Sequence, residues 1–112
     1  MNSFKADPLK TETPSSYPTG EMKELFEAIT SINSLKEAIN FFRDLLTLAE
    51  IKEFSNRWQI VKMLYRHKPY IEIAKKLNVS TATITRVAQW LNDGMGGYKA
   101  VAKRMFPVKF TG

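Results

Sequence analysis

Hydroxyl, methyl and amide side chains gather with three cations between residues 75 and 89. The set is Lys75, Lys76, Ser80, Thr81, Ala82, Thr85, Arg86 and Gln89. Hydroxyl, amide and guanidinium groups bond to base edges and phosphate oxygens, and small methyl groups contact thymine. Short side chains also let the first turn of a helix approach a groove closely, where the helix dipole favours phosphate. The chemistry predicted for this set is contact with double-stranded DNA.

The apolar residues around this set predict two short helices joined by a tight corner. They fall at Ile73, Ala74, Leu77, Val79, Ile84, Val87, Ala88 and Leu91. The small Ala74 suits a close helix crossing, Asn78 tolerates a left-handed backbone, and Ser80 suits a helix N-cap. Residues 70–91 are therefore typical of a helix-turn-helix whose second helix, over 80–92, reads DNA. A plain helix hairpin inside a bundle has similar spacing and is the alternative.

Four further segments have the apolar spacing of amphipathic helices. Their ranges are 20–31, 34–45, 47–67 and 97–107. Ser34 and Thr47 each precede a glutamate by three residues, which is the spacing of a capping box. Pro69 is expected as the first residue of the helix that follows it. Because no segment alternates with period two for long, the prediction is an all-α protein of six helices.

Composition and charge bound the domain organisation and the partner. With 112 residues, the chain suffices for one domain with a modest core. Residues 1–18 hold three prolines and few apolar side chains, which predicts a flexible tail before a helical DNA-binding and dimerisation domain over 19–112. Residues 1–50 carry a balance of −3, whereas residues 51–112 carry +9. A polyanion would meet the second half, although a basic surface kept for solubility is the alternative.

Several function classes are excluded or disfavoured. The absence of cysteine and the single histidine, His67, argue against thiol chemistry and metal binding, and a reducing cytoplasm is the expected compartment. No apolar run approaches a membrane span, and no signal peptide is evident. The glycines of 94–97 lack the Lys-Ser/Thr of a phosphate loop and are expected to form a corner. We find no enzymatic motif.

The chain resembles the Trp-repressor-like family. The resemblance is carried by LLTLAEIKEFSNRWQIVKMLYR at 45–66 and by ATITR at 82–86, which matches the start of that family's recognition helix. The segment LNDGMGGYKAV at 91–101 is similar to the branch of Trp-repressor-related YerC/YecD-type proteins. The similarity spans roughly 20–106, so the expected fold is a six-helix intertwined homodimer with a helix-turn-helix in each protomer.

The resemblance also implies an effector pocket. Thr47, Arg57 and Arg86 match a threonine and two arginines of the family's tryptophan site. Val87 stands where the family has a small glycine, and Trp90 where it has a serine that meets the ligand's amino group. These changes add bulk and remove a polar partner, which argues against tryptophan as a corepressor. Trp90 could fill the pocket itself, and an unknown small-molecule effector remains an alternative.

Three functions follow in order. The first is a sequence-specific transcriptional regulator, a repressor that binds a palindromic operator as a dimer. The second is a nucleic-acid-binding protein without sequence choice, and the third is a helical protein-interaction module. Arg57 and Arg86 have plain alternative roles in an intramolecular salt bridge or a phosphate contact. No cofactor or metal is expected.

Overall fold

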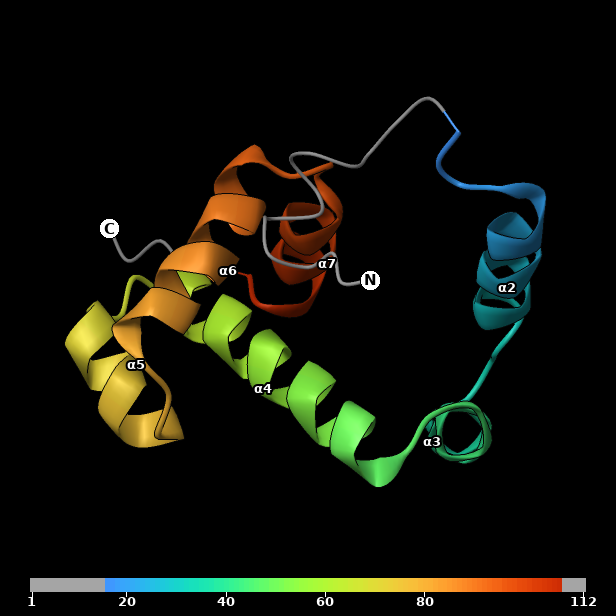
Figure 1. The fold of residues 1–112 in the computed structure, drawn as a ribbon, viewed down its shortest axis with the longest axis horizontal. Helices are drawn as coiled ribbons and strands as arrows, with labels where there is room; N and C mark the ends of the chain where they lie inside the picture. The colour runs from blue at the N-terminus through green and yellow to red at the C-terminus, as the bar shows by residue number, and fades with distance from the viewer. Residues whose placement is uncertain (1–15, 108–112) are drawn as a thin grey trace, which may run out of the picture. The chain divides into compact units, whose positions relative to one another are not determined.

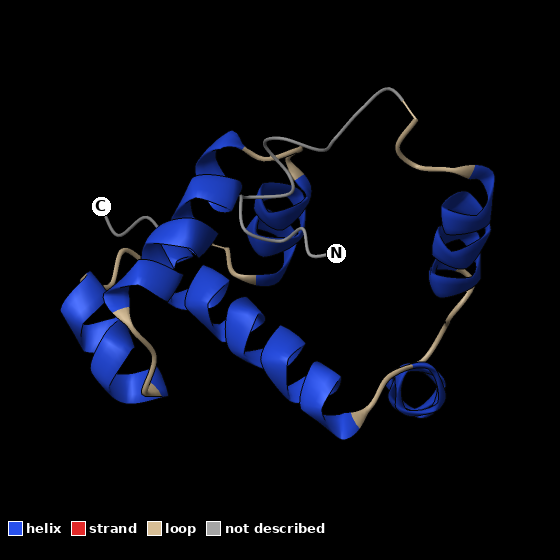
Figure 2. Cartoon of the chain, viewed as in Figure 1, coloured by secondary structure: helices blue, strands red, loops and turns tan. Residues whose placement is uncertain are grey.

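The computed structural model describes residues 16–107, and every regular element in this range is a helix (Figures 1 and 2). In chain order the elements are α2 (Gly20–Thr30), α3 (Leu35–Leu45), α4 (Leu48–Tyr65), α5 (Tyr70–Leu77), α6 (Thr81–Asp93) and α7 (Gly97–Met105). The prediction of an all-α chain with six helices is confirmed over these residues. Most of the predicted tail, 1–18, lies outside the described residues.

The predicted capping residues begin the helices by local hydrogen bonds. The Ser34 hydroxyl accepts from the Glu37 N–H at 3.0 Å, at the start of α3. The Thr47 hydroxyl accepts from the Glu50 N–H at 3.1 Å, while the Thr47 N–H donates to the Glu50 carboxylate at 2.9 Å. The second pair is a complete capping box, and it satisfies donors that the first turn of α4 leaves without helical partners.

The junction of α4 and α5 confirms one expectation and corrects another. Helix α4 ends because His67 turns into the left-handed region, with φ 59°, and the Lys68 N–H donates to the Met63 carbonyl at 3.0 Å. Pro69 is the N-cap of α5 and not its first residue. Its φ of −64° fits a helix, but its ψ of 146° is extended. The extended ψ lets the Pro69 carbonyl accept from the Ile73 N–H at 3.1 Å, so the helix begins one residue later than predicted.

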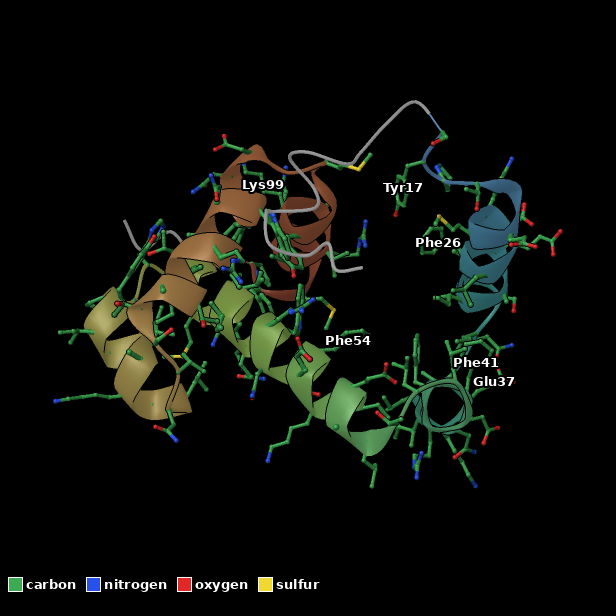
Figure 3. All side chains as sticks on the ribbon, viewed as in Figure 1. Tyr17, Phe26, Glu37, Phe41, Phe54 and Lys99 are labelled. Atoms are coloured by element: carbon green, nitrogen blue, oxygen red, sulfur yellow. The ribbon has the colours of Figure 1, made fainter. Side chains whose placement is uncertain are left out.

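The chain divides into two compact units, residues 1–52 and 53–112. Within the described part of the first unit, neither α2 nor α3 has a buried residue. Leu35 is 78% exposed and Ile39 is 59% exposed, although both are large and apolar. The Tyr17 ring meets Phe26 edge-on at 6.3 Å between centroids (Figure 3). This unit therefore exposes an apolar surface with very little core of its own.

The second unit contains the hydrophobic core of the described chain. Its buried members come from α4, α5, α6 and α7 and from the residue after α7, and they are Ile60, Val61, Met63, Ile73, Ile84, Val87, Leu91, Ala102 and Phe106. Trp58 packs against this core, with its ring 5.4 Å from that of Phe106 and 6.3 Å from that of Tyr98. Burial raises the pKa of Tyr98 above its usual value against the opposing effect of Arg57. The Tyr98 hydroxyl thus stays uncharged at neutral pH.

Candidate nucleic-acid interface

Helices α5 and α6 meet at a three-residue turn, Asn78 to Ser80. Asn78 adopts the left-handed conformation, with φ 55° and ψ 49°, and its N–H donates to the Ala74 carbonyl. The Val79 N–H donates to the same carbonyl at 3.2 Å. Two donors on one carbonyl close the end of α5 and turn the chain sharply toward α6. The left-handed role predicted for Asn78 is confirmed.

The inner faces of the two helices hold the corner in place. Ile73 of α5 and Ile84 of α6 are fully buried, and Val87 is 3% exposed. Ala74, Leu77 and Val79 pack against this core as partly buried residues. One face of α6 is therefore committed to packing, which leaves the opposite face in solvent.

Every residue predicted to contact DNA is exposed in the single chain. These are Lys75, Lys76, Ser80, Thr81, Ala82, Thr85, Arg86 and Gln89. The two lysines belong to the last turn of α5, and the remaining residues run from the N-cap of α6 along its outer face. The structure thus brings the set together at one corner of the second unit.

Hydrogen bonds within α6 already use several of its hydroxyl groups. The Ser80 hydroxyl accepts from the Thr83 N–H at 3.1 Å and lies 3.0 Å from the Thr83 hydroxyl. The Thr85 hydroxyl donates to the Thr81 carbonyl at 2.9 Å. Ser80 is therefore the N-cap first of all, and Thr85 offers a methyl group and a hydrogen-bond acceptor in place of a free donor.

Arg86 is the cation on the outer face of α6. Its side chain forms no hydrogen bond or ion pair with any residue of the described range. The planar guanidinium therefore keeps its donors for an external group, such as a guanine edge or a phosphate. The structure resolves the two roles open to Arg86 in favour of an external contact over an intramolecular salt bridge.

The predicted effector pocket is assembled only in part. Arg57 forms an ion pair with Glu53 at 2.6 Å, and its guanidinium lies 6.0 Å from the centre of the Trp90 ring. Trp90 is half-buried and Val87 is buried. Thr47 belongs to the first unit, where its hydroxyl and N–H are used in the cap of α4. The salt bridge of Arg57 and the bulk of Trp90 fill space that a ligand would need.

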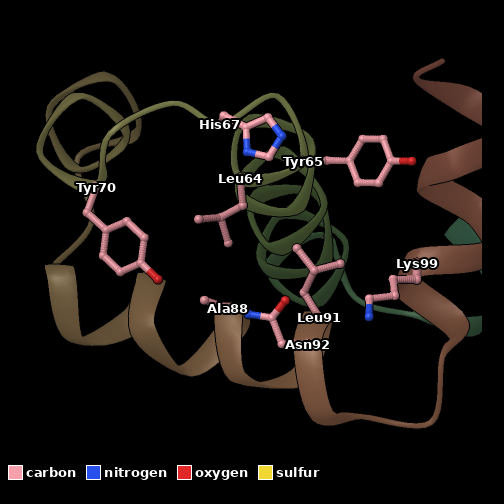
Figure 4. Close-up of a pocket in the computed structure, with 8 residues that line it drawn as sticks. All are labelled: Leu64, Tyr65, His67, Tyr70, Ala88, Leu91, Asn92 and Lys99. Atoms are coloured by element: carbon pink, nitrogen blue, oxygen red, sulfur yellow. The ribbon is translucent and has the colours of Figure 1, made fainter. Parts of the chain in front are cut away.

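A cavity of about 430 Å³ lies elsewhere in the second unit (Figure 4). Its lining residues come from the end of α4, the start of α5, the second half of α6 and the first turn of α7, and they are Leu64, Tyr65, His67, Tyr70, Ala88, Leu91, Asn92 and Lys99. None of them belongs to the predicted effector pocket. Sequence reasoning missed this site because its residues share no spacing along the chain, and His67 alone drew attention.

Metal and membrane functions find no support in the part of the chain that is described. Residues 16–107 contain no cluster of three or more histidine, aspartate or glutamate side chains that could hold a metal ion. No described helix combines the length and apolar character needed to cross a bilayer. The glycines after α6 form a corner, with Gly96 at φ 90°.

Fold and site together define an all-helical protein that presents a polar recognition-type helix beside a basic corner. The family model of the Trp repressor protein matches residues 20–106. The chain belongs to this family, which is one of transcription regulators and not of enzymes. Family membership indicates a DNA-binding regulator.

Three similar proteins support this assignment. The chain is 36% identical over 85 residues to the uncharacterized protein YerC of Bacillus subtilis (strain 168), covering 76% of this chain and 82% of YerC. A TrpR-like protein from Eubacterium eligens superposes with a TM-score of 0.78 at 40% identity, covering 87% of this chain and all of that one. A candidate Trp repressor from Staphylococcus aureus superposes with a TM-score of 0.73 at 36% identity, covering 80% and 90%.

Proposed function

We propose that this protein is a sequence-specific transcriptional regulator, a repressor that binds a palindromic operator as a homodimer. Helices α5 and α6 act as its helix-turn-helix, and α6 enters the major groove. The observation that carries the proposal is the division of α6 into a buried apolar face and an exposed face with an uncommitted Arg86. Lys75 and Lys76 sit at the corner, where they would contact the phosphate backbone.

Dimerisation is supported by the first unit. Its helices α2 and α3 bury no side chain, and the exposed apolar residues include Met22, Leu25, Phe26, Leu35 and Ile39. Apolar surface of this extent marks an interaction site in a protein of this size. A second copy of the chain is the partner that the family resemblance implies. The resulting two-fold symmetry would match an inverted repeat in the operator.

We further propose that DNA binding does not require tryptophan. Trp90 supplies an indole ring of the chain's own, and Arg57 lies against that ring and against Phe54, 5.7 Å from its centre. The regulator would then be active without a corepressor, in the cytoplasm where its operator is found. An unidentified small molecule would act elsewhere on the chain.

Selection of bound duplexes from a random library, with and without tryptophan, tests this function. The expected result is an enriched inverted repeat whose half-sites lie about one helical turn, roughly 34 Å, apart. The same sequences should be enriched in both conditions. Enrichment of no sequence from bound duplexes would instead support a nucleic-acid-binding protein without sequence choice, which the +9 balance of residues 51–112 also fits. Absence of DNA binding would support a protein-interaction module.

A further inference from the structure

We infer that the cavity between α4, α5, α6 and α7 binds a small aromatic carboxylate. The cavity lies entirely within the second unit, and its volume of about 430 Å³ falls within the usual range of small-molecule sites. It lies apart from the pocket around Arg57 and Trp90, since the two share no lining residue. The inference therefore goes beyond the proposed DNA contact and does not depend on it.

The apolar part of the cavity suits an aromatic body. Leu64 of α4 and Leu91 of α6 lie between Tyr70 on one side and Tyr65 on the other (Figure 4). Ala88 adds a small side chain at the same level, which leaves room beside α6. Aromatic rings at the sides of an apolar floor favour a flat apolar ligand over a sugar or a polyamine.

The polar part of the cavity suits one negative charge. Lys99 and Asn92 supply an ammonium and an amide, and His67 supplies an imidazole, whereas no carboxylate lines the cavity. Lys99 is exposed and forms no ion pair with any residue of the described range. A single ammonium pairs well with one carboxylate, whereas a phosphate group would be better matched by arginine. A monoanionic aromatic acid fits this combination best.

The position of the cavity gives binding a consequence for the corner. Tyr70 starts α5, and Ala88, Leu91 and Asn92 belong to α6, so one ligand would contact both helices of the proposed helix-turn-helix. A ligand that bridges them would stiffen the corner. A resulting change in DNA affinity rests on the proposed function, whereas binding itself does not.

Titration of the isotope-labelled protein with 3-phenylpropionate, observed by NMR without DNA, tests the inference. Amide shifts should move for residues 64–67, 70, 88–92 and 99, with saturation in the millimolar range. The neutral 3-phenylpropionamide should bind roughly tenfold more weakly because it cannot pair with Lys99. Because no DNA is present, failure here leaves the regulator proposal intact, and failure of DNA binding leaves this result intact.

The variant Lys99→Gln should weaken 3-phenylpropionate binding by roughly tenfold, because it removes the ammonium and keeps the length of the side chain. Lys103→Gln is the matched control: Lys103 is exposed on the same helix but does not line the cavity, and its loss should leave binding unchanged. Both variants should keep the amide spectrum of the folded protein. The inference is overturned by an absence of shifts, by shifts confined to residues 54–57 and 86–87, or by equal binding of the acid and the amide.

Discussion

Arg86 is the residue on which the proposed DNA contact depends most. It lies on the outer face of α6, and its guanidinium has no ion-pair partner among the described residues. The exposed hydroxyls beside it are less free, because the Ser80 and Thr85 side chains already bond to the backbone of α6. Specific recognition therefore falls mainly to Arg86, Gln89 and the small side chains of the first turn.

Replacing Arg86 by alanine should weaken operator binding by about 5- to 150-fold, corresponding to one arginine contact of about 1–3 kcal/mol. Fluorescence anisotropy with a selected duplex measures the change. Arg104→Ala is the control, because Arg104 is exposed on α7 away from α6. Both variants should remain dimers. Dissociation of the Arg86→Ala dimer would show that Arg86 has an interior role, and the assignment to DNA would be wrong.

Trp90 makes the second prediction at this scale. Millimolar tryptophan should change operator affinity by less than about threefold, because the indole of Trp90 and the ion-paired Arg57 occupy the corresponding space. Isothermal titration with tryptophan alone should likewise register no specific heat. A large gain in operator affinity on adding tryptophan would contradict the proposal that Trp90 replaces an effector.

The helix pair α5–α6 shows how an element depends on one backbone conformation. Asn78 holds φ 55°, and the N–H groups of Asn78 and Val79 both donate to the Ala74 carbonyl. A β-branched residue is strongly disfavoured in this region, whereas glycine enters it at little cost. The angle between the two helices follows from this turn and from the buried pair Ile73 and Ile84.

Asn78→Val should lower the free energy of unfolding by about 1–2 kcal/mol, because it places a β-branched side chain in the left-handed region. Asn78→Gly, the matched variant, should change it far less. Urea unfolding followed by circular dichroism measures both. Equal stability of the two variants would mean that the turn does not require a left-handed residue at position 78.

Helix limits were predictable from sequence because their causes are local. Ser34, Thr47 and Ser80 cap helices through bonds to residues three positions away, and Asn78 ends α5 through its own conformation. The one-residue error at Pro69 arose because proline suits both the N-cap and the first helical position.

The cavity beside α6 could not be predicted in the same way. Tyr65, Tyr70 and Lys99 meet only after α4, α5 and α7 have packed around a common core. The ion pair of Arg57 with Glu53 was only one of two roles open from sequence, because spacing of four residues permits a salt bridge without requiring it. Non-local packing decided both features.

At the scale of the whole molecule, the apolar surface of the first unit has to be covered. Leu35 and Ile39 of α3 are largely exposed, and α2 and α3 contribute no buried residue. A polar medium disfavours such a surface, since each apolar side chain moved out of water contributes about 1.5–3 kcal/mol. Association with a second copy is the arrangement that the proposed function requires.

Ile39→Glu should convert the dimer into monomers, because it places a charge within the apolar surface of α3. Light scattering should give a mass of twice 12.9 kDa for the original chain and one half of that for the variant. Lys36→Glu on the same helix is the control and should remain dimeric. A monomeric original chain would remove the basis for a two-fold symmetric operator.

Competition binding at fixed salt tests the central claim most directly, which is that the exposed face of α6 reads a DNA sequence. The labelled duplex carries the selected inverted repeat, and the competitor is the same duplex with its bases shuffled. The account predicts a preference of roughly 10³-fold or more for the selected duplex, with affinity that falls steeply as salt rises. Equal affinity for the two duplexes would contradict it.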